Sequence, residues 1–482
     1  MNQPSALPPS DQSNSSGTHL GLISLVCLVI GNMIGVGVYV SAGYALSDLR
    51  NARYVLLVWL VAGVHAICGA VAYAAVAKRF SVSGGEYAIL SRGAHPSLGF
   101  VAGWVSIFAG FAAPIAAAAL VFADYAWKSF GGDGSQSSSV QWLAITVVVV
   151  AAIFHWVEIK WNAWVNNLII GLKLVGITLF TGFGLRWILG GHGSDGILES
   201  AGGSVESNQD LIWLAMGSFF YTTLAYTGFN ASIYLAGANT SDLIDPTQKT
   251  LASIEPAAEN SPTPNLEWNR LIAKSMILAC AIVTVIYLAL NAIFLFSIPA
   301  EQLTGAGERF VGEVAIAIGG KWFGQLTSWL IILSTGTSVL AMMMTGPHVY
   351  LQLARDLGWA SKVRSERTQT RIAITCQTII ACVIILFSKL SDTISYLGLT
   401  LTACGGLAIA SMWIAQSKGE FREKLDIRWW EHLCAAIYVL GAFALLAIAF
   451  MRPEQHLKFV WSMLTFLAGL AVYGIFRLLR SK

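Results

Sequence analysis

Long, nearly uncharged apolar stretches recur along the chain from residue 20 to residue 479. With 56% hydrophobic and 11% charged residues, the sequence lies outside the range of soluble proteins. Polar backbone groups inside a bilayer must be satisfied within the protein, and the alternating pattern of a β-barrel is missing. We therefore expect an all-α membrane protein. At roughly 20 apolar residues per helix, about twelve transmembrane helices are predicted, at about 20–45, 54–77, 98–127, 140–155, 162–190, 210–237, 272–297, 325–353, 371–387, 393–415, 432–450 and 459–479.

The spans leave no room for a soluble domain, so one transmembrane domain is expected over residues 20–479. Residues 1–19 are rich in Ser and Pro and contain no Lys or Arg. They are interpreted as a disordered cytoplasmic tail rather than a signal peptide. Residues 238–271 are acidic and Pro-rich, and we expect them to form a flexible cytoplasmic loop between the sixth and seventh spans.

Lys and Arg are distributed unevenly among the connections. If the amino terminus is cytoplasmic, the inner segments hold roughly twice as many of these residues as the outer loops. This predicts cytoplasmic termini in a plasma membrane or bacterial inner membrane. The net charge of +3 reflects this bias and does not support nucleic-acid binding. The seven cysteines occur singly, without a C-x-x-C pair, so neither a structural disulfide nor a metal site is expected.

The first and sixth spans carry small and polar residues at mid-depth. Gly31, Asn32, Gly35 and Gly37 lie close together in the first, and the sixth contains AYTGFN at 225–230. Glycine in a membrane helix often serves only close packing. Paired interruptions in corresponding segments of two halves, however, are typical of transporters built from inverted repeats, with the substrate site at the breaks. We favour this second interpretation.

An unwound segment exposes N–H groups at the start of one half-helix and carbonyl groups at the end of the other. The helix dipoles favour opposite charges at these two ends, which suits a zwitterion. Glycine lets the backbone turn and lets a ligand approach it. A carboxylate is expected at the N–H groups of Val36, Gly37 and Val38. An ammonium is expected at the carbonyl groups near Met33, Ile34, Leu224 and Ala225.

Lys173 is the one Lys or Arg that falls deep within a predicted span. An ionisable residue in the membrane indicates a functional site by default, although it can also snorkel to an interface. The long apolar stretch on its far side favours function, either in proton exchange or as a fixed cation in place of sodium. The spans lack an obvious deep Asp or Glu, so sodium coupling has little support. Span eight offers hydroxyl groups that can bond Lys173 or a neighbouring helix, namely Ser334, Thr335, Thr337 and Ser338.

Four residues are candidates for gates or pocket walls. Tyr226, Phe229 and Asn230 either line a pocket in span six or pack against other helices. Glu86, in SGGEY at 83–87, lies on the predicted cytoplasmic side, where its charge can lock an inner gate. P-loop, H-E-x-x-H and G-x-S-x-G motifs are missing, so ATP-driven pumping and hydrolysis lack their residues and no cofactor is expected.

The chain resembles the amino acid–polyamine–organocation (APC) family of permeases over nearly its whole length. The resemblance rests on five landmarks in order: GNMIGVGVYVSAG at 31–43, SGGEYAIL at 83–90 with HPSLGFVAGW at 95–104, Lys173, AYTGFN at 225–230, and GPHVYLQLARD at 346–356. It implies a five-plus-five inverted repeat with broken helices one and six, plus two additional helices, and alternating access. It also implies that the Thr227 carbonyl helps to hold the amino group, and that Lys173 ties helix five to helices one and eight.

Three departures from the family pattern affect gating and substrate size. Val36 stands where Ser is usual, Leu224 replaces an aromatic gate, and Ala236-Gly237 replaces an acidic pair. The resemblance implies a secondary transporter, not an enzyme, for amino acids or related amines. The non-aromatic gate favours a neutral side chain, and both proton symport and exchange remain open.

One alternative is a nutrient sensor that keeps the permease fold and signals through residues 238–271. A channel or membrane-bound enzyme is disfavoured, because a selectivity ring and a nucleophile–base pair are missing. The particular substrate, the direction of transport, the oligomeric state and any accessory subunit are not predicted by the sequence.

Overall fold

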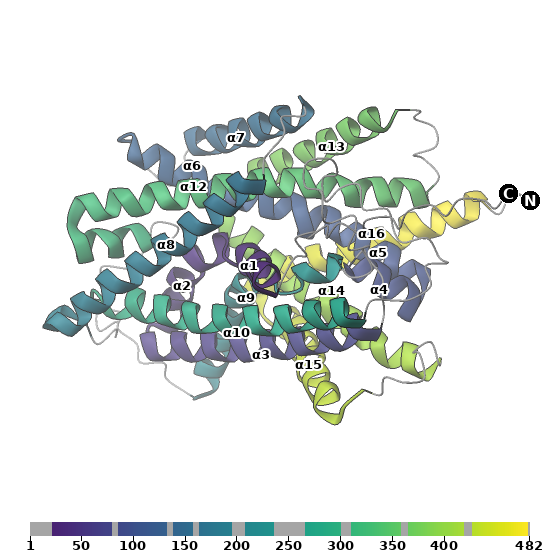
Figure 1. The fold of residues 1–482 in the computed structure, drawn as a ribbon, viewed down its shortest axis with the longest axis horizontal. Coiled ribbons are helices and arrows are strands. Elements are labelled where there is room, and N and C mark those ends of the chain that lie inside the picture. The colour runs from purple at the N-terminus through teal and green to yellow at the C-terminus, as the bar shows by residue number, and fades with distance from the viewer. Residues whose placement is uncertain are drawn as a thin grey trace, which may run out of the picture.

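All twelve predicted spans contain helices (Figure 1). The computed structural model describes residues 22–79, 85–132, 138–157, 163–194, 208–235, 266–299, 310–357, 365–418 and 427–480, and every regular element within these ranges is a helix. Among these residues, ten helices are each long and apolar enough to cross a membrane. The bent pair α1 and α2 forms a further span, and α9 has a shorter apolar stretch at Leu211–Ala225. The predicted all-α membrane fold is confirmed.

The first half of the chain contains one broken span and one with a π-helical insert. Pro114 lies at the start of α6, where its missing N–H disturbs the helical ladder of span three, and the preceding turns widen into η1. The elements are α1 (Leu22–Met33), α2 (Val36–Leu49), α3 (Ala52–Arg79), α4 (Gly85–Gly93), α5 (Pro96–Val105), η1 (Ser106–Ala112), α6 (Ala113–Ser129), α7 (Ser138–Trp156), α8 (Ala163–Trp187) and η2 (Ile188–His192).

The second half begins with the other broken span. Its elements are α9 (Asn208–Ala225), η3 (Ala231–Leu235), α10 (Leu266–Phe296), α12 (Phe310–Asp356), α13 (Glu366–Phe387), α14 (Leu390–Ser417), α15 (Trp429–Met451) and α16 (Pro453–Arg480). The predicted tail at 1–19 lies outside the described residues, as does most of the predicted loop at 238–271. The end of that loop prediction was wrong, because α10 already begins at Leu266.

Two helical segments were not predicted. Residues 85–93 form the short helix α4, where the sequence suggested only a turn. The helix α12 begins at Phe310 rather than near residue 325, and Gly320 interrupts it at φ 73° and ψ −175°. This backbone conformation is accessible essentially only to glycine, so Gly320 separates a short leading helix from span eight.

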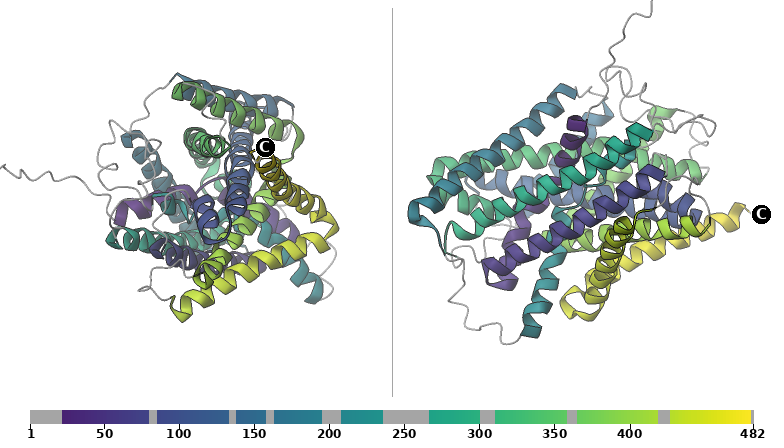
Figure 2. Two further views of the ribbon diagram at one scale, coloured as in Figure 1. Left: turned by 90° about the vertical axis from the view of Figure 1, so that its right-hand side faces the viewer. Right: turned by 60° about the horizontal axis from the view of Figure 1, so that its bottom comes forward.

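The two broken spans lie in the middle of the bundle. In Figure 1, α1, α2 and α9 lie between α3 and α10 on one side and α6 and α12 on the other. The helix α2 packs along α9, and α1 packs along α10. Figure 2 shows α15 and α16 at the periphery, where their many exposed apolar side chains suit contact with lipid.

Candidate functional site

The break in span one exposes the start of α2. The helix α1 ends at Met33, α2 begins at Val36, and the two are bent by 46°. Gly35 is the N-cap residue and provides no side-chain hydrogen bond to the helix. The first N–H groups of α2 therefore lack the side-chain acceptor that usually caps a helix, and such a terminus attracts an anion. These are the N–H groups predicted for a carboxylate, at Val36, Gly37 and Val38.

The break in span six follows Ala225, the last residue of α9. Residues 226–230 form turns, and Gly228 has φ 92°, a left-handed conformation that favours glycine. Thr227 donates twice to the Leu224 carbonyl, from its backbone N at 3.0 Å and from Oγ1 at 2.7 Å. The predicted interruptions of spans one and six are both confirmed.

Glycines bring the two breaks into direct contact. A Cβ at Gly37 would stand 2.6 Å from Ala225 Cα, and one at Gly228 would stand 3.0 Å from the Asn32 carbonyl oxygen. A Cβ at Gly35 would meet no atom within 4 Å. Gly37 therefore permits the approach of span six, whereas the sequence suggested that it permits the approach of a ligand. The open space lies at Gly35.

The sequence analysis missed Tyr287 on α10. Its fully buried hydroxyl lies 2.7 Å from the Met33 carbonyl oxygen and 3.1 Å from that of Ala225. The hydroxyl therefore connects the carbonyl ends of the two broken spans. Three of the four carbonyls predicted for an ammonium thus lie within hydrogen-bond distance of a protein donor, although the single hydroxyl hydrogen of Tyr287 can serve only Met33 or Ala225 fully at one time. Ile34 is the fourth, and the described residues provide no donor to its carbonyl.

Lys173 reaches span one through span eight. Its Nζ donates to Ser338 Oγ at 3.5 Å, and Ser338 Oγ donates to the Ser334 carbonyl at 2.9 Å. On the other side, the Tyr39 hydroxyl of α2 donates to Ser334 Oγ at 3.3 Å. The three residues predicted for coupling, Lys173, Ser334 and Ser338, therefore lie together. Tyr39 joins them and was not predicted. The other two candidate hydroxyls, Thr335 and Thr337, donate to carbonyls of their own helix.

Glu86 links α4 to spans two and six. Its carboxylate accepts a hydrogen bond from the Tyr73 hydroxyl at 3.0 Å and another from Asn230 Nδ2. The Phe229 ring packs edge-on against Tyr73, with centroids 5.7 Å apart. Two of the three gating candidates, Glu86 and Phe229, therefore meet in one cluster with Asn230, which was predicted to line the substrate site. The third gating candidate, Tyr226, lies apart and donates to the Trp59 carbonyl at 3.1 Å.

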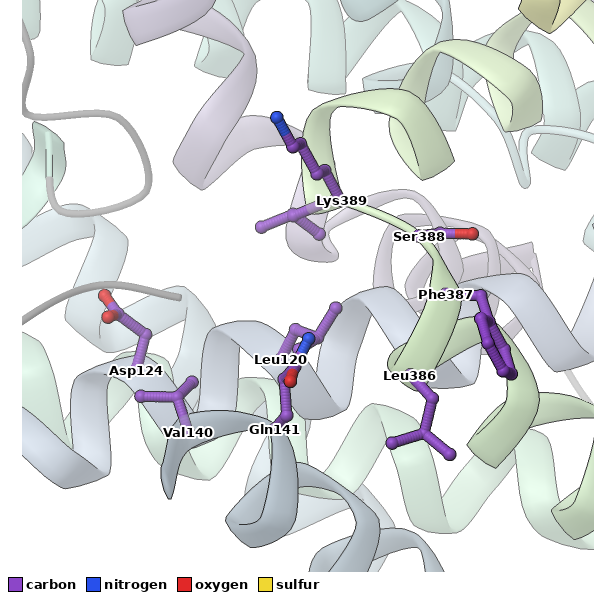
Figure 3. Close-up of a pocket in the computed structure, with 9 residues that line it drawn as sticks. Leu120, Asp124, Val140, Gln141, Leu386, Phe387, Ser388 and Lys389 are labelled. Atoms are coloured by element: carbon purple, nitrogen blue, oxygen red, sulfur yellow. The ribbon is translucent and has the colours of Figure 1, made fainter. Parts of the chain in front are cut away.

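A cavity of about 210 Å³ lies elsewhere, between α6, α7 and the junction of α13 and α14 (Figure 3). None of the predicted site residues lines it, so it is separate from the two breaks. Within the described ranges, no group of three His, Cys, Asp or Glu side chains is arranged to hold a metal ion. The cavity is lined by Leu120, Asp124, Val140, Gln141, Leu386, Phe387, Ser388, Lys389 and Leu390.

Comparison with known proteins extends over nearly the whole chain. Residues 20–476 match the family model described as amino acid permease. The chain is 26% identical to the serine/threonine exchanger SteT of Bacillus subtilis over 390 residues, 79% of this chain and 80% of that protein. It is 22% identical to the b(0,+)-type amino acid transporter 1 of Mus musculus over 477 residues, 96% of this chain and 89% of that protein. It is also 23% identical to the Mus musculus large neutral amino acids transporter small subunit 2, over 72% of this chain and 61% of that protein.

Proposed function

The chain belongs to the amino acid permease family, in agreement with its resemblance to the APC permeases, and we propose that it is a secondary transporter of neutral amino acids that works by alternating access. One observation carries the proposal. The uncapped start of α2 lies beside the carbonyl ends of α1 and α9, with open space at Gly35. Helix ends of opposite polarity favour a ligand with one positive and one negative group, and the head group of an amino acid has both.

The substrate's carboxylate binds the N–H groups of Val36, Gly37 and Val38 in this proposal. Its ammonium binds the carbonyls of Ile34 and Ala225, while Met33, Leu224 and Thr227 shape the same turns. No residue in this set is charged. A charged substrate side chain would lose its hydration without gaining a partner from the set, which is costly. A neutral side chain is therefore favoured.

Lys173 couples span five to spans one and eight in this proposal, through Ser338, Ser334 and Tyr39. When it is protonated, Lys173 places a positive charge here, which reduces the need for a bound cation. The name of the Bacillus relative, an exchanger, supports exchange of one amino acid for another over proton symport.

The inner gate consists of Glu86, Asn230, Tyr73 and Phe229, which connect α4 with spans two and six. A charge-assisted hydrogen bond is about twice as strong as a neutral one, so Glu86 suits a contact that must hold and then release. Tyr226 also belongs to span six, and its hydroxyl donates to the Trp59 carbonyl of span two. Both termini face the cytoplasm in this proposal, as the distribution of Lys and Arg favours, and the membrane is the plasma membrane or bacterial inner membrane.

Uptake into proteoliposomes tests this function. A panel of labelled neutral, acidic and basic amino acids is offered with or without unlabelled amino acid inside, and with or without an inward proton gradient. We expect neutral amino acids to enter and internal substrate to accelerate entry. Lys173→Ala should abolish this acceleration, whereas Lys321→Ala, which removes an exposed lysine, should not.

Three other results would contradict parts of the proposal. Uptake that is accelerated by an inward proton gradient, and not by internal amino acid, would indicate proton symport. Preference for charged amino acids would contradict the proposed neutral substrate. Binding of an amino acid without any uptake would indicate the sensor.

A further inference from the structure

A second cavity, of about 480 Å³, opens at the edge of the bundle between α5 and α16. Figure 1 shows α4, α5 and the last turns of α16 at the same end of the bundle, and α5 packs against both of the other helices. Small-ligand sites in proteins have volumes of about 300–1,000 Å³, so this cavity has room for a ligand. Gly474 independently marks open space here, because a Cβ at this position would meet no atom within 4 Å. The cavity is lined by His95, Ser97, Tyr473, Gly474, Arg477 and Leu478.

The charged groups at this cavity are basic. Arg477 is exposed at its wall, and none of the six lining residues is acidic. Among the residues that the structure describes, no carboxylate forms an ion pair with Arg477. Two further basic residues belong to the same corner of the molecule. Arg92 lies three residues before His95 in α4, and the Lys418 ammonium donates to the Ala94 carbonyl at 2.7 Å. The cavity therefore attracts an anion.

His95 provides a hydrogen-bond donor with a fixed direction. Its Nδ1 accepts a hydrogen bond from the Ser97 backbone N at 3.2 Å and lies 2.8 Å from the Ser97 hydroxyl oxygen. When one nitrogen of a neutral imidazole accepts, the other carries the hydrogen, so Nε2 is the donor. The His95 side chain is exposed, and its Nε2–H group can therefore donate to a ligand. Arg477 adds a planar guanidinium, whose N–H groups match the oxygens of a phosphate.

The cavity lies beside an apolar surface. Figure 2 shows α16 at the periphery of the bundle, and Ile475, Leu478 and Leu479, around Arg477 on this helix, are largely exposed. Such side chains suit contact with acyl chains. The distribution of Lys and Arg assigns this end of α16 to the cytoplasmic side, where anionic lipids attract basic residues near the membrane surface. An anionic group joined to acyl chains therefore fits both parts of the surface.

We propose that this cavity binds the head group of an anionic phospholipid. The phosphate lies between the Arg477 guanidinium and the His95 imidazole, and the acyl chains run along the exposed face of α16. The lipid thereby joins α16 to the turn between α4 and α5. The inference goes beyond the proposed function and does not depend on which amino acid is carried.

The test compares two lipids that have the same acyl chains but differ in the charge of the head group. Native mass spectrometry of the purified full-length protein in detergent measures binding of dioleoylphosphatidylglycerol, which is anionic, and of dioleoylphosphatidylcholine, which has no net charge. The wild type should bind the anionic lipid at least about tenfold more tightly. Arg477→Gln and His95→Ala should each weaken binding of the anionic lipid at least about fivefold. Binding of the uncharged lipid should change less than about twofold in both variants.

Arg371→Gln is the matched control. It removes an exposed arginine that is also predicted on the cytoplasmic side, but on α13, where the guanidinium carbon lies 5.7 Å from the centroid of the Trp156 ring. This variant should change binding of the anionic lipid less than about twofold. Melting temperatures measured without added lipid should be equal in all variants. Arg477→Lys keeps the charge and should recover most of the affinity that Arg477→Gln loses.

Three results would contradict the inference. Equal affinity of the wild type for the two lipids would remove the basis for an anionic head group. Equal weakening by Arg477→Gln and Arg371→Gln, or none by Arg477→Gln, would show general attraction to basic residues rather than a site at this cavity. Glycerol 1-phosphate tests the other source of a phosphate group. Its binding to the cavity as tightly as the anionic lipid would indicate a soluble phosphate ester as the occupant.

Discussion

An alanine at position 37 tests whether the contact between the two breaks is needed for transport. The new Cβ would stand 2.6 Å from Ala225 Cα and 2.9 Å from Ala225 N, whereas ordinary contacts begin at 3.4 Å. Both opposing atoms belong to the backbone, so a change of rotamer gives no relief, and α2 and α9 must move apart by roughly 1 Å. Overpacking of this kind costs about 1–3 kcal/mol, equivalent to about 5- to 150-fold in an equilibrium constant. We expect the ratio of maximal uptake rate to KM to fall by that factor.

The assay is uptake of labelled amino acid into proteoliposomes, with the thermal stability of the detergent-solubilised protein measured in parallel. Gly474→Ala on α16 is the matched control, because its Cβ meets no atom within 4 Å, and both properties should stay at the wild-type level. Gly35→Ala should keep the stability but weaken substrate binding, because its methyl group enters the open space beside α2. Wild-type uptake and stability in Gly37→Ala would refute the requirement for this contact.

Three further predictions concern other contacts of the fold. Glu86→Gln should weaken the cluster with Tyr73 and Asn230 by about 1–2 kcal/mol. Cys404 is a buried thiol on α14, which packs against α4, the helix of Glu86. In a chain whose other six cysteines are serine, labelling of Cys404 from the cytoplasmic side should accelerate about tenfold, and an unchanged rate would argue against an inner gate at Glu86. Tyr39→Phe removes the hydrogen bond to Ser334. The rate of amino acid exchange should therefore fall about two- to tenfold, with little change in the affinity for substrate. An equal loss of exchange rate and affinity would place Tyr39 at the ligand. Glu431→Ala should lower the melting temperature more than Lys128→Ala does. The Glu431 side chain is 3% exposed in its ion pair with Lys78, whereas the side chains of the Lys128–Glu313 pair are 41% and 39% exposed. Equal shifts of the melting temperature would contradict this ranking.

Local sequence was enough to predict the breaks in spans one and six, because glycine and asparagine interrupt otherwise apolar runs there. It was also enough to single out Lys173, since one charge in a long apolar segment stands out. Tyr287 gave no such signal. It lies within the apolar run VIYLAL, where a tyrosine reads as ordinary packing, and its importance comes from Met33 and Ala225, which are far away in sequence.

The leading part of α12 was missed for a different reason. The predicted eighth span began only near residue 325, after the charges of Glu313 and Lys321, although Phe310 and Val314 are fully buried and belong to the hydrophobic core. These residues are helical because they pack against other helices of the bundle, and the sequence alone does not show which helices those are.

Substrate protection of single cysteines is the most direct test of where the amino acid binds. Val36→Cys and Gln141→Cys are each made in a chain whose seven native cysteines are serine, and labelling by a small thiol reagent is measured with and without saturating amino acid. Val36 begins α2 at the break, and Gln141 lines the separate cavity of Figure 3. We predict that substrate slows labelling at position 36 by at least about tenfold, as expected for [L] near ten times Kd, and leaves position 141 unchanged. Protection at position 141 with none at position 36 would contradict a substrate site between the broken spans.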